Sequence, residues 1–297
     1  MLEFRKVELS DKERITSLLH SAPDRGCEYT FGNIFIWRDV YGTKVAFTDD
    51  GLCVIRFERE VDAFLFPFGE GDVKKAVSNM MADAELRGIH FRIIAATTED
   101  TRVLDGLFPD MFKHHTSRDF AEYVYNTEDL IELKGKKFHG KRNHIFRFIQ
   151  DYPEYGFIEI TPENIGEVRE MNDRWYEEML EEYGDDGLIA ERVAANSAFD
   201  NFFELGFKGG YIKISSGIIG FSMGEPINSE TFCVHIEKAC YNINGAYTII
   251  NRDFAKCFCE KYRYINREDD VGDEGLRRAK LSYNPEILTD KYVVSKQ

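Results

Sequence analysis

The sequence of 297 residues lacks any long apolar run. Its longest apolar stretches, near residues 45–47 and 64–68, fall far short of the roughly 20 residues that a membrane-spanning helix needs. The first ten residues mix charged with apolar side chains, unlike the continuous apolar stretch of a secretory signal peptide. We therefore expect a soluble, cytoplasmic protein with no integral membrane segment.

Signatures of common cofactors and metal sites are absent as well. Neither the G-x-G-x-x-G pattern of dinucleotide folds nor the G-x-x-x-x-G-K-[ST] pattern of P-loops occurs. The six cysteines form no C-x-x-C pair, and none has a histidine at zinc-finger spacing. Adjacent residues such as His114 and His115 cannot both face one metal ion on a regular element. We expect free thiols, no metal site and no required cofactor.

One apparent catalytic motif occurs in the wrong context. Residues 220–224 read G-F-S-M-G and match the nucleophile elbow of hydrolases, which is a sharp turn from a strand into a helix. Here Pro226 and Asn228 predict a turn between two strands instead. No histidine follows His235, so the serine could find its acid and base only in Glu230 and His235. We therefore do not expect a serine hydrolase.

Positive charge is the scarcer kind and is unevenly distributed. The chain carries 38 Lys and Arg against 53 Asp and Glu, for a formal net charge of -15. Six of these basic residues and no acidic residue lie in the segment 134–147, which leaves 32 basic residues against 53 acidic ones elsewhere. Such a segment can attract a polyanion, or it can be a solvated helix face or a basic helix end. Its candidate phosphate-binding residues are Lys136, Lys137, Lys141, Arg142 and Asn143.

The length and the order of elements predict two domains. A chain of this size usually folds around more than one core of roughly 150 residues. Capping boxes, turn residues and apolar periodicity predict two halves that each run strand, helix, antiparallel strands, helix, strand, which is typical of a mixed α/β fold. The expected domains are 1–130 and 131–297. The expected strands include 44–48, 52–57, 89–95, 121–125, 157–160, 210–215, 218–223, 231–238, 264–266 and 292–295. Three of the expected helices begin after Ser10, Asp72 and Thr161, and three more lie at 101–108, 245–262 and 273–281.

Polar residues at the end of one apolar strand suggest proton transfer. The strand 231–238 ends with His235, Glu237 and Lys238. Strict alternation would place His235 and Glu237 side by side on one face of the sheet. A carboxylate beside an imidazole suits general acid–base chemistry, and a hydrogen-bonded structural pair is the alternative.

A second polar stretch lies between a strand and a helix. Residues 264–272 read Y-I-N-R-E-D-D-V-G and lead into the helix that carries Lys280. Such a density of mixed polar groups is typical of a binding loop. The spacing of Glu268, Asp269 and Asp270 differs from that of a calcium loop, so we expect these carboxylates to bind an ammonium group.

Together these stretches carry a resemblance that covers nearly the whole chain. The sequence resembles a bacterial family related to the C-terminal domain of phosphatidylglycerol lysyltransferase. This resemblance implies two tandem domains of the GCN5-related acyltransferase fold, as in Fem-type peptidyltransferases. We expect the N-terminal domain to be degenerate. The marks that carry it are Glu28-Tyr29-x-Phe31-x-Asn33, Trp37-Arg38, Lys134-Gly-Lys-Lys-Phe-His-x-Lys-Arg-Asn143, His235-x-Glu237-Lys238, Asn266-Arg-Glu-Asp-Asp-x-Gly272 and Lys280-x-Ser-Tyr-x-Pro285.

The resemblance implies transfer of an amino acid from aminoacyl-tRNA to an amine or hydroxyl acceptor, and from its charge we expect the basic segment to bind the tRNA or a cofactor phosphate. Because the ester is already activated, the protein needs to orient the acceptor, remove a proton and stabilise an oxyanion. We expect Glu237, helped by His235, to act as the base or to position the acceptor. Lys238 or Lys280 would stabilise the oxyanion. The expected substrate-binding residues are Asn266, Glu268, Asp269, Tyr247, Asn251 and Tyr283.

Departures from the resemblance leave alternatives. The lysyltransferase has a membrane-spanning region that this sequence lacks, so the acceptor could be a small molecule or a peptide rather than a lipid headgroup. Acetyl-CoA users of the fold carry Q/R-x-x-G-x-G/A where residues 240–246 read C-Y-N-I-N-G-A. An acetyl-CoA-dependent N-acetyltransferase is therefore one alternative. A non-catalytic module that binds RNA or protein is another.

Overall fold

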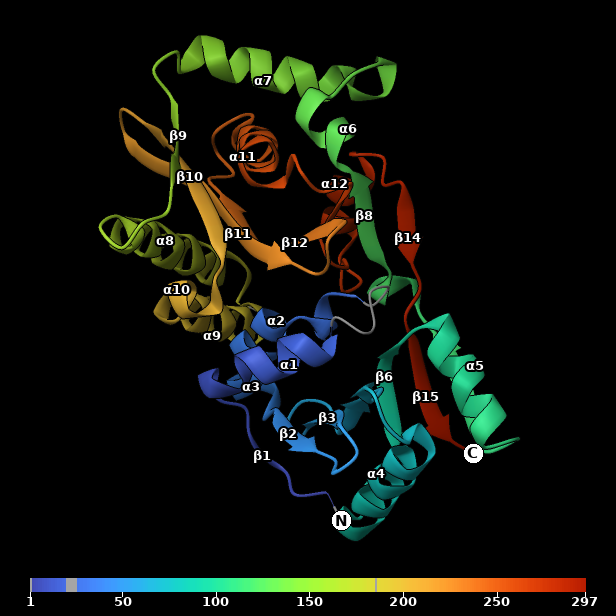
Figure 1. Cartoon of the computed structure of the whole chain (residues 1–297). Coiled ribbons are helices and arrows are strands. Elements are labelled where there is room, and N and C mark those ends of the chain that lie inside the picture. The colour runs from blue at the N-terminus through green and yellow to red at the C-terminus, as the bar shows by residue number, and fades with distance from the viewer. Residues whose placement is uncertain (1, 20–25, 185) are drawn as a thin grey trace. The chain divides into compact units, whose positions relative to one another are not determined.

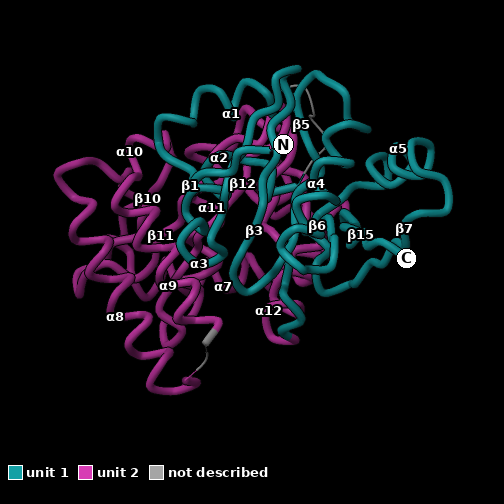
Figure 2. The backbone as a smooth tube through the Cα atoms, turned by 90° about the horizontal axis from the view of Figure 1, so that it is seen from below, with its two compact units in different colours: residues 1–122, 269–273, 289–297 teal, residues 123–268, 274–288 magenta. Residues whose placement is uncertain are grey.

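The computed structural model describes residues 2–19, 26–184 and 186–297 (Figure 1). The chain divides into two compact units, which differ in colour in Figure 2. Unit 1 comprises Met1–Glu122, Asp269–Asp273 and Thr289–Gln297, and unit 2 comprises Tyr123–Glu268 and Glu274–Leu288. Each unit is built on one mixed β-sheet. Of the described helices, none is long and apolar enough to cross a membrane.

Unit 1 contains an eight-stranded sheet in which β4 and β6 pair in parallel. In spatial order its strands are β1 (Arg5–Lys6), β2 (Lys44–Phe47), β3 (Leu52–Phe57), β4 (Ala63–Leu65), β6 (Arg92–Ala96), β15 (Tyr292–Lys296) and β7 (Phe112–Thr116), with β5 (Phe68–Gly69) paired to β3. Its helices are α1 (Lys12–Leu19), α2 (Phe31–Ile36), α3 (Arg38–Tyr41), α4 (Val73–Arg87) and α5 (Thr98–Leu107).

The helix α4 forms where the sequence predicts a helix. The side chain of Asp72 accepts a hydrogen bond from the backbone N–H of Lys75 at 2.9 Å and so caps the first turn. Gly88 ends the helix with a φ of 68°, a backbone conformation that glycine adopts without strain. The apolar side of α4 packs with α5 against one face of the sheet. This core includes Val77, Met80, Ile93, Leu104 and Val294.

Unit 2 contains a seven-stranded sheet in which β12 and β13 pair in parallel. Its spatial order is β14 (Ile287–Thr289), β8 (Glu122–Asn126), β13 (Tyr264–Asn266), β12 (Thr231–Ala239), β11 (Gly217–Pro226), β10 (Lys208–Ile214) and β9 (Gly156–Glu159). Its helices are α6 (Thr127–Glu132), α7 (His139–Asp151), α8 (Ile165–Tyr183), α9 (Asp186–Asp200), α10 (Phe202–Leu205), α11 (Ala246–Phe254) and α12 (Glu274–Leu281), and a π-helical turn at Ala255–Cys259 follows α11.

Helices cover both faces of the sheet of unit 2, as Figure 1 shows. On one face α7 and α11 share a core with the sheet. On the other face lie α8 and α9, where Trp175 donates a hydrogen bond to the carbonyl of Ala239 at 3.1 Å and Phe199 packs 5.5 Å from the ring of Phe221. The core of the α11 face includes Phe148, Phe232, Val234, Ile249 and Ile250.

A β-bulge interrupts the pairing of β11 with β12. Met223 pairs with Ile236, whereas Gly224 pairs with Val234, so His235 has no partner on β11. An extra residue of this kind reverses the alternation of side chains between the two faces of a sheet.

Because of the bulge, His235 and Glu237 lie on opposite faces. Glu237 approaches Asn251 of α11, while Lys238 binds Glu191 of α9. The prediction that His235 and Glu237 share a face is therefore wrong. Strict alternation holds only for a regular strand, and a bulge leaves no clear mark in a single sequence.

The structure also divides the chain differently from the predicted boundary at residue 130. The strand expected at 121–125 is β8, which pairs with β13 in the sheet of unit 2. The C-terminal strand β15 lies between β6 and β7 in the sheet of unit 1. Such pairings join residues that are far apart in the chain, so local sequence patterns do not encode them.

The bulge yields a test of stability. A Cβ atom at Gly224 would lie 1.9 Å from the carbonyl oxygen of Cys233, a distance that no packing allows. We expect Gly224→Ala to lower the free energy of unfolding by at least about 2 kcal/mol, as measured by urea unfolding followed by circular dichroism. The matched control is Gly166→Ala in α8, where a Cβ meets nothing within 4 Å. It should be neutral or stabilising by up to about 1 kcal/mol, and equal effects of the two changes would contradict a structural requirement for glycine at position 224.

Candidate functional site

A buried ion pair lies on the α11 face of unit 2. Arg267 Nη2 donates to Glu237 Oε1 at 2.6 Å, and both side chains are largely buried. The strand pairing brings them together, because β12 and β13 run parallel and Arg267 directly follows β13. Removing two charges from water is costly, so this pair must be held in good geometry.

Polar atoms without partners surround this ion pair. Glu237 Oε2 lies 3.4 Å from Asn251 Nδ2, a long hydrogen bond. Asn251 Oδ1 and Arg267 Nη1 are buried, and neither has a hydrogen-bond partner among the described residues. Buried polar groups almost always have partners, so such atoms point to a bound molecule or water. The site therefore offers acceptors on Glu237 and Asn251 and a donor on Arg267.

The serine of the G-x-S-x-G motif belongs to the same face. Ser222 pairs directly with Glu237 across the two strands, so both side chains lie on one side of the sheet. Its hydroxyl is buried and has no partner in the described part of the chain. Because Ser222 lies inside β11 and not at a turn into a helix, it is not a nucleophile elbow.

Lys141 of α7 faces this site instead of solvent. Its amino group lies 3.7 Å from the ring centroid of Tyr283, and the guanidinium of Arg267 lies 5.0 Å from the same centroid. Burial, and then the positive charge of Arg267, lower the pKa of Lys141 to about 8. A lysine with this pKa is partly neutral in mildly alkaline solution and can accept a proton. We call Glu237, Asn251, Arg267, Lys141 and Tyr283 the Glu237 cluster.

Lys280 and Lys238 have fixed partners. Lys280 Nζ donates to the carbonyl oxygen of Arg267 at 2.6 Å, so it holds the backbone beside the ion pair. Lys238 lies on the opposite face of the sheet, where it donates to both carboxylate oxygens of Glu191 at 2.8 Å and lies 4.0 Å from the ring of Trp175. Of the two lysines that were predicted to stabilise the oxyanion, only Lys280 is in contact with the Glu237 cluster.

His235 forms a separate cluster on the α8–α9 face. Its side chain is almost fully buried, with Nδ1 2.8 Å from Glu268 Oε1 and Nε2 3.2 Å from Glu225 Oε1. Burial lowers the pKa of His235, but Cys233, Glu225 and Glu268 together raise it well above its ordinary value. His235 is therefore an imidazolium held between two carboxylates. Only if His235 loses a proton could it hold a metal ion together with Cys233 and Glu268, whose ligand atoms lie within 4.8 Å of one another and of the imidazole.

The predicted substrate-binding residues do not form one group. Asn251 and Tyr283 belong to the Glu237 cluster, and Tyr247 lies on α11 with 39% of its surface exposed. The side chain of Asn266 accepts a hydrogen bond from the backbone N–H of Glu268 at 2.8 Å and so shapes the turn after β13. Asp269 belongs to unit 1, where it binds Lys291.

Three residues of the basic segment have partners close by in the chain, and two of these partners are carboxylates. Lys137 binds Asp129 at 2.7 Å, and Lys134 binds Glu128 at 3.3 Å. Arg142 donates to backbone carbonyls, including that of Gly135 at 2.7 Å. Asn143 is exposed and lies 3.2 Å from the ring of His139. Within the described residues, no carboxylate pairs with Lys136 or Arg147, and both are exposed on the surface.

Arg267 is the central residue that the sequence did not single out. It stands inside the motif Asn266-Arg-Glu-Asp-Asp, but a single arginine among four polar neighbours gives no signal of its own. Its role follows only from the pairing of β13 with β12.

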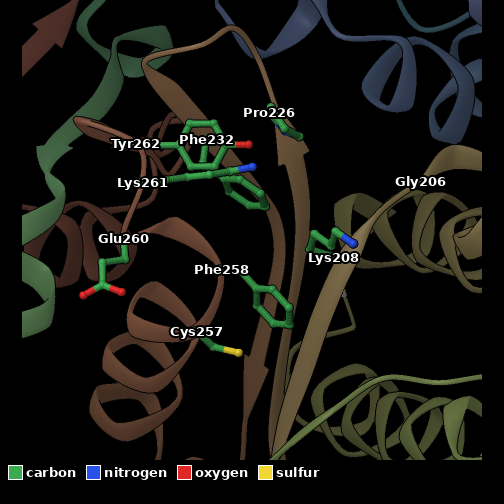
Figure 3. Close-up of a pocket in the computed structure, with 9 residues that line it drawn as sticks. All are labelled: Gly206, Lys208, Pro226, Phe232, Cys257, Phe258, Glu260, Lys261 and Tyr262. Carbon is green, nitrogen blue, oxygen red and sulfur yellow. The ribbon is translucent and has the colours of Figure 1, made fainter.

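A cavity of about 590 Å³ opens at the other end of β12 in unit 2 (Figure 3). It is lined by side chains that include Lys208, Phe232, Phe258 and Lys261. Phe232 lies near the start of β12 and Glu237 near its end, so this cavity is separate from the Glu237 cluster. None of the predicted site residues lines it.

Comparison with known proteins identifies relatives over the length of the chain. The model of the family described as "Phosphatidylglycerol lysyltransferase, C-terminal" matches residues 20–295. The crystal structure of a conserved protein of unknown function from Bacteroides thetaiotaomicron is 38% identical, with a TM-score of 0.94 and coverage of 100% of both chains. L-PGS from Bacillus licheniformis is 15% identical, with a TM-score of 0.63 over 96% of this chain and 91% of that chain.

A third solved structure defines the fold. A tandem GNAT protein from the clavulanic acid biosynthesis pathway has a TM-score of 0.50 at 9% identity over 100% of this chain and 98% of that chain. The predicted fold, mixed α/β in two tandem GNAT-like domains, is therefore confirmed. A curated relative, an uncharacterized protein from Mycoplasmoides gallisepticum, is 25% identical over 189 residues, 61% of this chain, and the chain spans 57% of its length.

The environment of His235 predicts a pH-dependent stability. A histidine whose pKa is higher in the folded than in the unfolded chain binds more protons when folded. Its contribution is complete below the unfolded pKa of about 6.5 and is lost as pH rises towards the folded pKa, by up to about 1.4 kcal/mol per pH unit. The double variant Glu225→Gln with Glu268→Gln should flatten this decline, as measured by urea unfolding at a series of pH values. Parallel pH profiles for the two proteins would contradict the assignment.

Proposed function

The chain belongs to the family of the C-terminal domain of phosphatidylglycerol lysyltransferase, and on this premise we propose that it is an acyltransferase that uses the Glu237 cluster. The proposed donor is aminoacyl-tRNA, and the proposed acceptor is an amine or a hydroxyl. The observation that supports this most is the set of unpartnered polar atoms around the ion pair of Glu237 with Arg267.

The atoms of the cluster match the groups that react in acyl transfer. An amine or hydroxyl acceptor presents hydrogens, which Glu237 Oε2 and Asn251 Oδ1 can accept. The carbonyl of an ester gains negative charge in the transition state, which the free N–H of Arg267 Nη1 can stabilise. Arg267 is thus the proposed oxyanion group, in place of Lys238, which lies on the other face of the sheet.

The reaction needs no covalent intermediate with the protein. The acceptor nitrogen or oxygen attacks the ester carbonyl and forms the new bond, while its proton passes to Glu237 or to neutral Lys141. The tetrahedral intermediate then collapses, the ester C–O bond breaks, and the same proton passes to the leaving ribose oxygen. Because Lys141 has a pKa of about 8, it can take part in this transfer near neutral pH.

The position of α7 supports a polyanionic donor. Lys141 reaches the Glu237 cluster from this helix, while Lys136 just before it and Arg147 on it are exposed. A tRNA bound along these two residues would lie against the same helix that contributes to the site. Phosphate contacts of this kind give affinity that falls as salt concentration rises.

The N-terminus of α11 argues against the acetyl-CoA alternative. Enzymes of this fold that use acetyl-CoA hold its pyrophosphate on backbone N–H groups at this helix start. A Cβ on Gly245, the residue before α11, would lie 2.8 Å from the carbonyl oxygen of His144 and 3.1 Å from Cβ of Phe148, both in α7. His144 Nδ1 is also 2.8 Å from Asn244 Oδ1. Since α7 covers this helix start, little room is left for a pyrophosphate.

Replacing one carboxylate tests the chemistry. We expect Glu237→Gln to lower transfer from radiolabelled aminoacyl-tRNA by at least about 100-fold, because an amide neither accepts the proton nor balances Arg267. The control is Glu170→Gln, an exposed position on α8, which should retain full transfer. Thermal unfolding of both variants verifies folding. A folded Glu237→Gln protein with normal transfer would refute the role of Glu237.

A second pair of variants tests the donor. We expect Lys136→Ala with Arg147→Ala to weaken tRNA binding and to reduce the slope of log affinity against log salt by about 1.5 to 2, because two phosphate contacts are lost. The matched control, Lys134→Ala with Lys137→Ala, should change the slope less, since these lysines already pair with carboxylates. Equal slopes for the native chain and both double variants would argue against tRNA binding at this helix. If the native chain binds tRNA but transfers no amino acid, a non-catalytic module would be favoured.

A further inference from the structure

Unit 1 encloses a cavity of about 510 Å³ that the proposed chemistry does not use. One wall is the face of the sheet opposite to α4 and α5. Ile93 packs in the core beneath those helices, so Arg92 and Ile94 point the other way. The other wall comes from α2 and α3, through residues such as Trp37 and Tyr41. This volume lies within the range of pockets that bind small molecules.

The walls of the cavity are largely aromatic and apolar. The rings of Trp37 and Tyr41 are stacked with their centroids 5.4 Å apart. Phe57, Phe120 and Tyr292 also line the cavity. Such faces favour an apolar body and can also attract a cation.

One part of the cavity wall carries a buried cluster of charges. Lys291 Nζ lies 2.5 Å from Glu28 Oε1, 3.0 Å from Asp269 Oδ2 and 3.3 Å from Glu122 Oε1. Three carboxylates thus surround a single ammonium group. Glu28, Asp269 and Lys291 line the cavity, whereas Glu122 is fully buried behind them.

Glu28 retains a carboxylate oxygen that nothing in the described chain satisfies. Glu28 Oε2 is buried, and no described donor lies within hydrogen-bond distance of it. Burial raises the pKa of Glu28 to about 7, although Lys291 acts in the opposite direction. The protein alone therefore stabilises the negative charge of Glu28 incompletely.

Several residues of the family motifs line this cavity and have no part in the proposed acyl transfer. Glu28, Asn33, Trp37 and Asp269 all belong to the motifs that carry the family resemblance, and all four line this cavity. They come from segments that are more than two hundred residues apart in the chain. The chemistry proposed at the Glu237 cluster involves none of them.

We propose that this cavity binds a primary ammonium group attached to an apolar, preferably aromatic, body. The ammonium would donate to Glu28 Oε2 and supply the second positive charge that three carboxylates accommodate. The body would lie against Trp37 and Tyr41. The carboxylates would repel an anion of the same shape. A neutral molecule could offer Glu28 Oε2 only a hydrogen bond without charge, which is weaker. The inference is independent of the acyl transfer proposed for unit 2.

Three probes with one body test the proposal on the native full-length chain. Phenethylamine, 2-phenylethanol and 3-phenylpropionate share a phenyl ring on a short alkyl chain and differ in their polar group. By isothermal titration calorimetry at pH 8, we expect phenethylamine to bind saturably and at least about tenfold more tightly than the other two, which corresponds to about 1.4 kcal/mol. Equal affinities for the amine and the alcohol, or no saturable binding of the amine, would overturn the proposal.

A variant locates the binding. Glu28→Gln should weaken phenethylamine binding at least about tenfold and leave the binding of 2-phenylethanol unchanged, because it removes a charge and keeps the shape. The matched control is Glu85→Gln, an exposed position on α4, which should bind like the native chain. Unchanged amine binding in a folded Glu28→Gln protein would overturn the assignment. Should that variant fail to fold, the probe series on the native chain still decides the proposal. None of these measurements uses acyl transfer, so their failure is distinct from failure of the proposed function.

Discussion

The β-bulge at His235 is the constraint on which the chemistry proposed for unit 2 depends. It assigns Glu237 to the face covered by α7 and α11 and assigns His235 to the opposite face. Without it, the ion pair of Glu237 with Arg267 could not form beside Asn251. Buried ion pairs often stabilise a fold no better than apolar side chains of the same size. Fold stability alone therefore does not account for this pair, whereas a role in a functional site does.

Local signals in the sequence predicted much of the fold, because caps and turns act over a few residues. The helix between Asp72 and Gly88 and the strand at 264–266 lie where the sequence indicates. The sequence also named Glu237, Asn251 and Tyr283, which lie together. It did not predict the bulge, the place of β15 or the partners of Arg267, since each depends on pairing between distant segments.

The two units hold buried charges in opposite balance. In unit 2 the carboxylate of Glu237 is matched by Arg267, with Lys141 nearby, and burial and then the charge of Arg267 lower the pKa of that lysine. In unit 1 the ammonium of Lys291 is outnumbered by carboxylates, and burial raises the pKa of Glu28 although Lys291 acts in the opposite direction. This difference in balance agrees with the two proposals, a polyanionic donor at unit 2 and an ammonium group at unit 1.

The path of the chain between the two sheets has a consequence for how the protein can be divided. Residues 269–273 and 289–297 return to unit 1 after unit 2 has been built, and β15 fills the space between β6 and β7. A fragment that ends near residue 130 would leave both of those strands with unpaired edges, which favours aggregation. Unit 1 therefore cannot be expressed as a contiguous N-terminal fragment, and we expect its sheet to be completed only after the last residues of the chain have left the ribosome.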